Sequence, residues 1–271
     1  MTEQGETNNE SGRRDSSDET ARRPAWQYDE MKPSGVNYNE VRLAGKYDAR
    51  HTKFRDYKRE AEQIIAALGL DGSATVMDMG CGTGAFALHA ARHYRKVHAV
   101  DVSEAMLDLA REKAREARLA NIEFHHGGFL TYEHQAEPVD AVVSTVALHH
   151  LPDFWKCVGL HRLAQMVRPD GRFYLFDVVF SFPIERYDAS IVQFISTMRE
   201  QMGPTGQTEP ETHVRDEYST CHWIMEGMLD RAGFRIDTVN YINEFLAGYL
   251  CTRKDDSTPV TLLTDAASQL R

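Results

Sequence analysis

The chain has 271 residues, of which 42% are apolar and 27% charged, and its formal net charge is −10. This length suffices for one large α/β domain or two small ones with a full core. The acidic excess argues against a broad phosphate-binding surface, so nucleic acid is not an expected partner. No run approaches the roughly 18 apolar residues of a spanning helix, and the first residues lack a signal-peptide core. Four cysteines without a CxxC pair indicate neither disulfides nor zinc, so we expect a cytoplasmic protein without a metal site.

Composition predicts the domain organisation. Residues 1–25 are polar, cannot bury enough surface to offset their ordering entropy, and are predicted to be disordered. Residues 26–70 predict an N-terminal helical cap, because the apolar residues of 61–68 share one helical face that ends at Gly69. Residues 71–254 form the main domain, with an insertion at 181–219 that we expect to line an acceptor pocket. Residues 255–271 form a loose C-terminal tail.

Within the main domain, short apolar runs of strand length alternate with helical stretches. The first five runs are 74–77, 97–100, 122–124, 141–143 and 173–176, and a typical helical stretch between them is 104–119. This alternation favours parallel strands with right-handed crossovers. Runs 234–241 and 245–251 follow a helix at 225–232 and are joined by a short polar connection, which favours antiparallel pairing. The sequence therefore predicts a doubly wound, Rossmann-like sheet of seven strands, mostly parallel with an antiparallel last strand.

A glycine cluster follows the first predicted strand. Gly80, Gly82 and Gly84 stand at alternate positions before an alanine-rich helix. Glycines allow a tight turn and let a ligand lie against bare backbone, and a helix start offers free N–H groups. The second strand ends in Asp101, which is placed to accept both hydroxyls of a ribose. The whole unit predicts an adenosine-binding site.

The glycine spacing separates this site from a dinucleotide site. Dinucleotide enzymes use G-x-G-x-x-G, whereas this chain has G-x-G-x-G preceded by the acid Asp78, which suits a ligand amino group better than a diphosphate. With these residues the sequence resembles the class I S-adenosylmethionine-dependent methyltransferases. Within them it is similar to the small-molecule branch that includes the ubiquinone/menaquinone-type enzymes (methyltransferase type 11/25-like). The resemblance covers roughly residues 47–254, with further matching motifs at 100–106, 140–152 and 163–171.

The resemblance implies S-adenosylmethionine as co-substrate and assigns the residues that hold it. Gly80, Gly82 and Gly84 would cradle its methionine part, with Asp78 nearby, and Asp101 would hold the ribose. Val102 and Met106 would flank the adenine, and Ser144 would approach the amino-acid end. Gly128 and Phe129 complete the set of co-substrate-binding positions. One departure is Gly128, where relatives often carry an acidic or amide side chain that bonds the adenine amino group. Only backbone groups of Gly128 are available for that contact.

The candidate catalytic residues are His150, Tyr47 and Tyr38. Some related enzymes pair a histidine at the position of His150 with a tyrosine from an N-terminal helix, and Tyr28 is a further candidate. Ordinary packing is the alternative interpretation for all of them. If His149 and His150 lie in a strand they point to opposite faces, and we do not expect them to share a metal.

The sequence thus predicts in-line methyl transfer to a small-molecule acceptor whose attacking atom is sulfur, oxygen, nitrogen or carbon. The alternative is a non-catalytic S-adenosylmethionine-binding regulator or assembly partner. A dehydrogenase is disfavoured by the glycine spacing. Base-amine methylation of nucleic acid is disfavoured because residues 144–147 replace the Asn/Asp-Pro-Pro-aromatic motif of those enzymes.

Overall fold

The computed structural model describes residues 24–35, 55–203 and 208–255. The tails predicted at 1–25 and 255–271 lie almost entirely outside these residues, as do Tyr38 and Tyr47. Among the described residues, no helix is long and apolar enough to cross a membrane.

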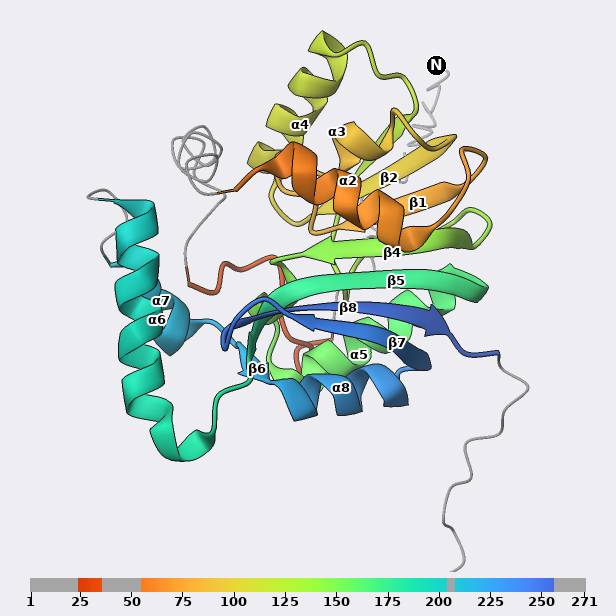
Figure 1. The fold of residues 1–271 in the computed structure, drawn as a ribbon. Coiled ribbons are helices and arrows are strands. Elements are labelled where there is room, and N and C mark those ends of the chain that lie inside the picture. The colour runs from red at the N-terminus through yellow and green to blue at the C-terminus, as the bar shows by residue number, and fades with distance from the viewer. Residues whose placement is uncertain (1–23, 36–54, 204–207, 256–271) are drawn as a thin grey trace, which may run out of the picture.

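The centre of the fold is a mixed sheet with the strand order β3-β2-β1-β4-β5-β8-β7 (Figure 1). All neighbours from β3 to β5 pair in parallel, and β8 pairs antiparallel with both β5 and β7. A two-residue strand, β6 (Thr220–Cys221), pairs with the end of β5. The seven strands are β1 (Thr75–Met79), β2 (Lys96–Asp101), β3 (Ile122–His126), β4 (Val139–Thr145), β5 (Val167–Phe180), β7 (Phe234–Tyr241) and β8 (Leu246–Arg253). The predicted seven-stranded sheet with an antiparallel last strand is confirmed.

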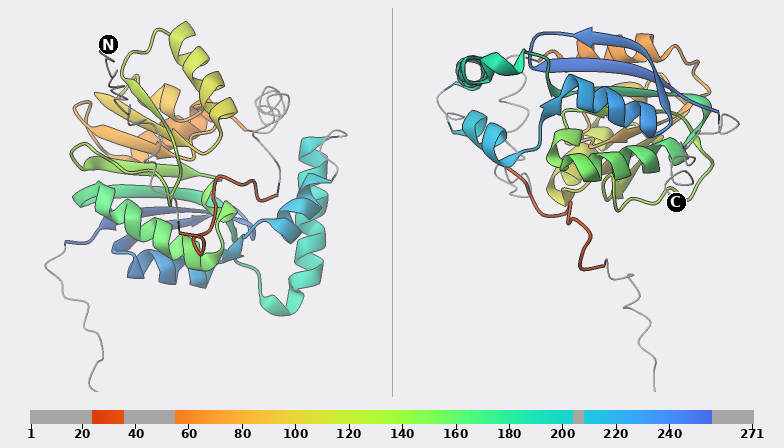
Figure 2. Two further views of the ribbon diagram at one scale, coloured as in Figure 1. Left: turned by 180° about the vertical axis from the view of Figure 1, so that it is seen from behind. Right: turned by 90° about the horizontal axis from the view of Figure 1, so that it is seen from below.

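Helices cover both faces of the sheet (Figure 2). One face carries α2 (Tyr57–Leu68), α3 (Ala87–Ala90) and α4 (Glu104–Glu116), and the other carries α5 (Asp153–Met166) and α8 (His222–Arg231). All five residues of β1 are buried, as expected for a central parallel strand between two helical layers. The order of the strands brings the carboxyl ends of β1, β2 and β4 to one edge of the sheet.

The N-terminal region is helical only in part. Helix α2 begins where the Asp56 carboxylate accepts a hydrogen bond from the Arg59 N–H (3.0 Å), and it ends at Gly69 in the left-handed conformation. Residues 24–35, by contrast, run as turns and bends, and Pro33 and Gly35 fall within that stretch. Of the helical cap predicted over 26–70, the described residues contain only α2.

The insertion after β5 forms an arm beside the sheet. Helices α6 (Tyr187–Met202) and α7 (Glu209–Asp216) lie to one side of the strands in Figure 1, after the short 3-10 helix η2 (Ile184–Arg186). A small apolar cluster of Val178, Phe194 and Phe245 joins this arm to the ends of β5 and β8. The arm is therefore attached to the edge of the sheet where the parallel strands end.

Candidate functional site

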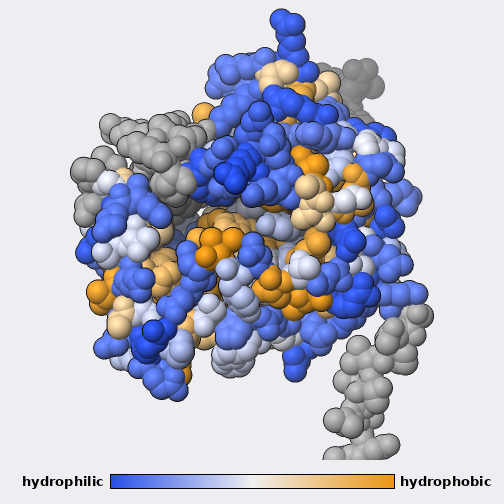
Figure 3. All heavy atoms as spheres, viewed as in Figure 1, coloured by the Kyte–Doolittle hydropathy of each residue, from blue (hydrophilic) through white to orange (hydrophobic). Residues whose placement is uncertain are grey.

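A pocket opens at the carboxyl ends of the parallel strands, where open α/β sheets bind ligands. Figure 3 shows the hollow on this side of the molecule, with apolar side chains at its rim. Residues from the glycine loop, from the ends of β2 and β4 and from the turn after β3 form the walls. The segment 30–34 closes the pocket from the N-terminal side. None of the described residues of 181–219 lines it, so the acceptor-pocket role of that insertion stays a prediction.

The glycine loop is built from left-handed backbone. Gly80, Gly82 and Gly84 have φ values of 78°, 53° and 82°, a region that residues with a Cβ avoid. A Cβ on Gly80 would collide with the methyl group of Ala147 across the pocket floor, whereas the space above Gly82 is open for at least 4 Å. Gly82 thus offers bare backbone to a ligand, and Gly80 allows β1 and the end of β4 to approach closely.

Two carboxylates, the buried Asp78 and the partly buried Asp101, hold the loop in place. Asp101 accepts hydrogen bonds from the N–H groups of Gly82 (2.7 Å) and Ser103 (2.8 Å), and its side chain borders the pocket. Asp78 accepts the N–H of Ala87, the first residue of α3 (3.1 Å), while its Oδ1 has no partner among the described residues. The start of α3 is therefore occupied by the protein's own carboxylate. Burial raises the pKa of both groups, that of Asp78 to about 7.

The structure brings together most of the predicted site residues. Those that line the pocket are Gly80, Gly82, Asp101, Val102, Met106, Gly128, Phe129 and His150. Three others lie just behind the wall: Asp78 and Ser144 are buried beneath the loop, and Gly84 faces Ala110 and Leu88. The Ser144 hydroxyl has no hydrogen-bond partner among the described residues. Tyr38 and Tyr47 lie outside the described residues.

The chain reverses sharply after β4. Val146 has a φ of 54°, which is unusual for a β-branched residue and marks local strain. The reversal is held by the Val146 N–H, which donates to the Phe176 carbonyl (2.7 Å), and it leads directly into the 3-10 helix η1 (Leu148–His150). The expectation that His149 and His150 diverge as strand neighbours is therefore wrong. In the 3-10 turn their ring centroids are 4.3 Å apart.

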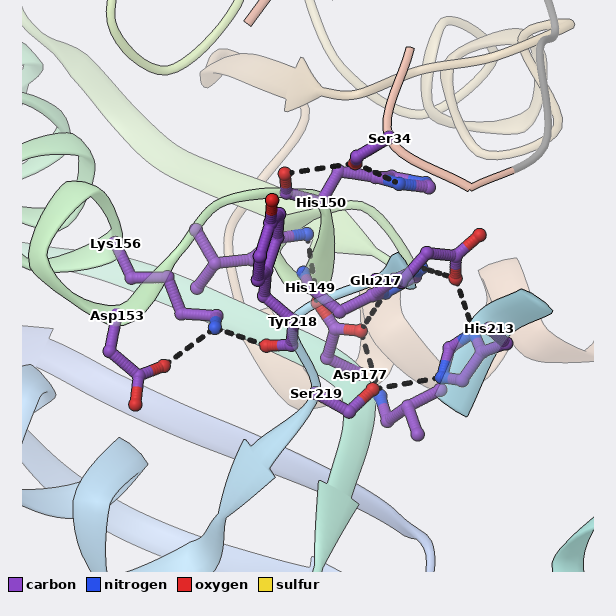
Figure 4. A network of polar contacts seen from close by, with 12 residues as sticks. Ser34, His149, His150, Asp153, Lys156, Asp177, His213, Glu217, Tyr218 and Ser219 are labelled. Carbon is purple, nitrogen blue, oxygen red and sulfur yellow. Dashed lines mark hydrogen bonds and ion pairs between the residues drawn. The ribbon is translucent and has the colours of Figure 1, made fainter. Parts of the chain in front are cut away.

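His149 lies at the centre of a buried polar network (Figure 4). Its Nδ1 is 2.5 Å from Asp177 on β5, and its Nε2 is 3.4 Å from Glu217, which follows α7. Glu217 also pairs with His213 of α7, and His213 contacts the Ser219 hydroxyl (2.8 Å). The network fixes η1 to β5 on one side and to the arm on the other.

This network shifts the pKa values of the two neighbouring histidines in opposite directions. Burial alone would lower the pKa of His149, but Asp177 and Glu217 outweigh it and raise the pKa to about 10. Burial, together with the charge on His149, lowers the pKa of His150 to about 4. His149 is thus a structural imidazolium between two carboxylates, and His150 presents a neutral ring to the pocket.

The segment 24–35 packs on His150 from outside. The Ser34 hydroxyl donates to the His150 carbonyl (3.1 Å) and lies 3.4 Å from its Nδ1, and the Tyr28 hydroxyl donates to the same carbonyl (3.4 Å). Glu30 of this segment reaches the opposite wall of the pocket at Gly128. Sequence reasoning missed Glu30, Ser34 and Glu217, since no local pattern marks them. Asp177, an acid within the apolar end of β5, was detectable.

Within the described part of the chain, two groups of side chains have metal-ligand chemistry. His149, His150 and Glu217 bring donor atoms within 4.8 Å of one another, but His149 already uses both nitrogens in its ion pairs. His98, Glu123 and His125 form the second group on β2 and β3, where His98 Nδ1 and His125 Nε2 lie 3.1 Å apart, at hydrogen-bond distance.

A mostly parallel sheet that carries a glycine loop, an acid at the end of β2 and a pocket above both is typical of the class I methyltransferase fold. Residues 76–171 match the family model described as a methyltransferase domain. An uncharacterised methyltransferase of Anoxybacillus flavithermus is 27% identical over 194 residues, which is 72% of this chain and 84% of that protein.

Solved structures share the same architecture. A SAM-dependent methyltransferase from Aquifex aeolicus superposes with a TM-score of 0.57 at 20% identity, over 79% of this chain and 98% of that one. A magnesium protoporphyrin IX methyltransferase from Synechocystis, solved with bound SAH, gives 0.55 at 17% identity, over 83% and 91%. Residues 76–171 thus match a methyltransferase domain, and the fold around them is that of the class I S-adenosylmethionine-dependent methyltransferases.

Proposed function

We propose that this enzyme methylates a small molecule that enters the pocket between the glycine loop and His150. The observation that carries the proposal is the composition of one pocket. Its floor is the glycine loop with Asp101, and its opposite side holds His150 and segment 30–34. A nucleoside co-substrate and a small acceptor can therefore meet in a single pocket. A concave pocket of this kind suits a small molecule better than a polymer surface.

The residues of the floor fit S-adenosylmethionine. The open space over Gly82 accepts the methionine part, and the Asp101 carboxylate, whose oxygens retain free lone pairs, accepts the ribose hydroxyls. Val102 and Met106 supply apolar walls for the adenine. Asp78 stands beneath the loop with an unpartnered oxygen, and its negative charge favours the cationic amino group. When bound, the co-substrate would supply an electrophilic methyl group that an acceptor atom attacks, with S-adenosylhomocysteine as the leaving group.

The chain's own residues then align the acceptor and exclude water. His150 presents a neutral imidazole, so it accepts a hydrogen bond from an acceptor O–H, N–H or S–H and orients the lone pair. With a pKa of about 4 in the free enzyme, His150 is a weak base. The acceptor must therefore bring a proton that is already acidic, or attack through a neutral amine or an electron-rich carbon. Sulfur, oxygen, nitrogen and carbon acceptors all remain candidates.

Labelled-methyl transfer tests this proposal. The purified enzyme is incubated with methyl-labelled S-adenosylmethionine and a panel of a thiol, a phenol, an amine and a quinol. We expect label in one acceptor class and its loss in Asp101→Ala. Binding of the co-substrate without transfer to any acceptor would contradict the proposal and favour a regulatory protein.

A further inference from the structure

The Glu30 carboxylate lies where a side chain on residue 128 would project. A Cβ on Gly128 would lie only 2.6 Å from Oε2 of Glu30 and 2.7 Å from Cγ1 of Val102. Glu30 belongs to the N-terminal segment, yet its carboxylate occupies the pocket wall beside the turn after β3. A carboxylate from a distant part of the chain thus stands where residue 128 would otherwise project.

The Glu30 side chain is firmly positioned. It is only 8% exposed, and its Oε1 accepts hydrogen bonds from the Leu130 N–H (2.9 Å) and the Thr131 hydroxyl (2.7 Å). The Thr131 hydroxyl also accepts the Gly128 N–H (3.0 Å), so the turn and the carboxylate form one unit. Both of these bonds to Glu30 end on Oε1, whereas Oε2 lies at Gly128. The Thr131 N–H is a further donor to this carboxylate, and because each carboxylate oxygen has two lone pairs, Oε2 can still accept a bond from a ligand.

The surroundings of Oε2 define what it can recognise. A carboxylate only accepts hydrogen bonds, so the ligand group must be a donor. Val102 and Met106 line the same part of the pocket with apolar surface, and Asp101 lies one residue before Val102. A flat, apolar-faced ring with an N–H donor at its edge, attached to a ribose, matches these three features. A buried carboxylate also gains more from such a donor than an exposed one does.

We propose that Glu30 binds the exocyclic amino group of the adenine and so provides the base-specific contact that Gly128 cannot. The proposal rests on the proposed function, because the adenine is that of S-adenosylmethionine. It makes segment 24–35 part of the co-substrate site. The same segment holds His150 through Ser34 and Tyr28. Binding of the co-substrate to Glu30 therefore also stabilises the position of His150, which faces the acceptor.

The test compares two ligands that differ at one position of the base. S-inosylhomocysteine carries a carbonyl oxygen where S-adenosylhomocysteine has the amino group, so it presents an acceptor to the carboxylate. We expect the unaltered enzyme to bind the adenosyl compound at least about tenfold more tightly in calorimetric titration. Glu30→Gln supplies an amide that can donate to the carbonyl, so the preference should fall by about 10- to 100-fold. Asp29→Asn, which removes a carboxylate of the same segment outside the pocket, is the matched control and should keep the preference.

Two results would overturn the proposal while leaving the proposed function intact. One is equal binding of both ligands by the unaltered enzyme, which needs no variant and does not depend on how Glu30→Gln folds. The other is a Glu30→Gln enzyme with an unchanged melting temperature and an unchanged preference. Failure of the unaltered enzyme to bind S-adenosylhomocysteine at all would instead refute the proposed function on which this inference depends.

Discussion

The Asp177→Asn substitution tests whether the buried network around His149 holds the site together. Asp177 is fully buried and receives hydrogen bonds from the N–H groups of Leu148 (2.8 Å), His149 (3.2 Å) and Val178 (2.7 Å), besides its ion pair with the His149 ring. Asparagine keeps the shape and loses the charge. His149 then retains a single carboxylate partner, Glu217, and η1 loses its strongest tie to β5.

The expected loss of stability is large. Burial alone would lower the pKa of His149, so its raised pKa means that Asp177 and Glu217 together outweigh the cost of burying the imidazolium. Removal of one partner from a buried ion pair costs about 3–5 kcal/mol, and the upper end is reached only if no relaxation occurs. Because the folded pKa lies above the unfolded one, this stabilisation is fully present below pH 6.5 and is lost as the pH rises towards 10. The difference between the two proteins should therefore shrink over that range.

Urea unfolding at pH 6 and pH 9 measures this effect. We expect Asp177→Asn to lower the free energy of unfolding by about 3 kcal/mol at pH 6, with a smaller difference at pH 9. Asp108→Asn, which removes an exposed partner of Arg111 on α4, is the control and should change stability by less than about 1 kcal/mol. A loss below about 1 kcal/mol for Asp177→Asn, or a loss that grows with pH, would refute this interpretation of the network.

Three further substitutions test the pocket itself. Because burial raises the pKa of Asp78 to about 7, its carboxylate ionises only near neutral pH, so the affinity for S-adenosylmethionine should rise between pH 5 and pH 8. Asp78→Asn should abolish that rise. If calorimetry gives the variant the same pH dependence of affinity as the unaltered enzyme, Asp78 does not bind the amino group of the co-substrate. His150→Gln should leave co-substrate affinity unchanged and slow labelled-methyl transfer by about tenfold or more; undiminished turnover would remove His150 from the mechanism. Gly80→Ala adds a left-handed backbone cost of about 1–2 kcal/mol to the collision with Ala147. Adding Ala147→Gly to Gly80→Ala should restore only the part of the stability that the collision removed. Full recovery of the melting temperature would show that the φ of Gly80 is unimportant.

The sequence predicted those parts of the molecule whose cause is local. The alternation of apolar strands and helices, the left-handed stop at Gly69 and the glycine loop before α3 all follow from short patterns, and the structure has them. The turn after β4 was not predictable in this way. Val146 adopts a conformation that its own side chain disfavours, held there by the Phe176 carbonyl of the next strand.

The pocket shows the same division between local and distant causes. Asp101 could be predicted because it ends a strand within a known motif, whereas Glu30 and Glu217 reach the site from distant segments without a motif of their own. The state of His149 likewise depends on two carboxylates that only the fold brings together. Such long-range contacts determine which histidine is charged, and no local sequence pattern predicts them.

Calorimetric titration with S-adenosylhomocysteine, S-adenosylmethionine and NAD tests most directly whether the pocket at the carboxyl ends of β1, β2 and β4 holds the methyl donor. We expect binding of both sulfur-containing nucleosides with one site per chain, no binding of NAD, and a sharp loss of affinity in Asp101→Ala. Binding that persists unchanged in Asp101→Ala would contradict the placement of the donor in this pocket. Preference for NAD would contradict the assignment of S-adenosylmethionine as the co-substrate.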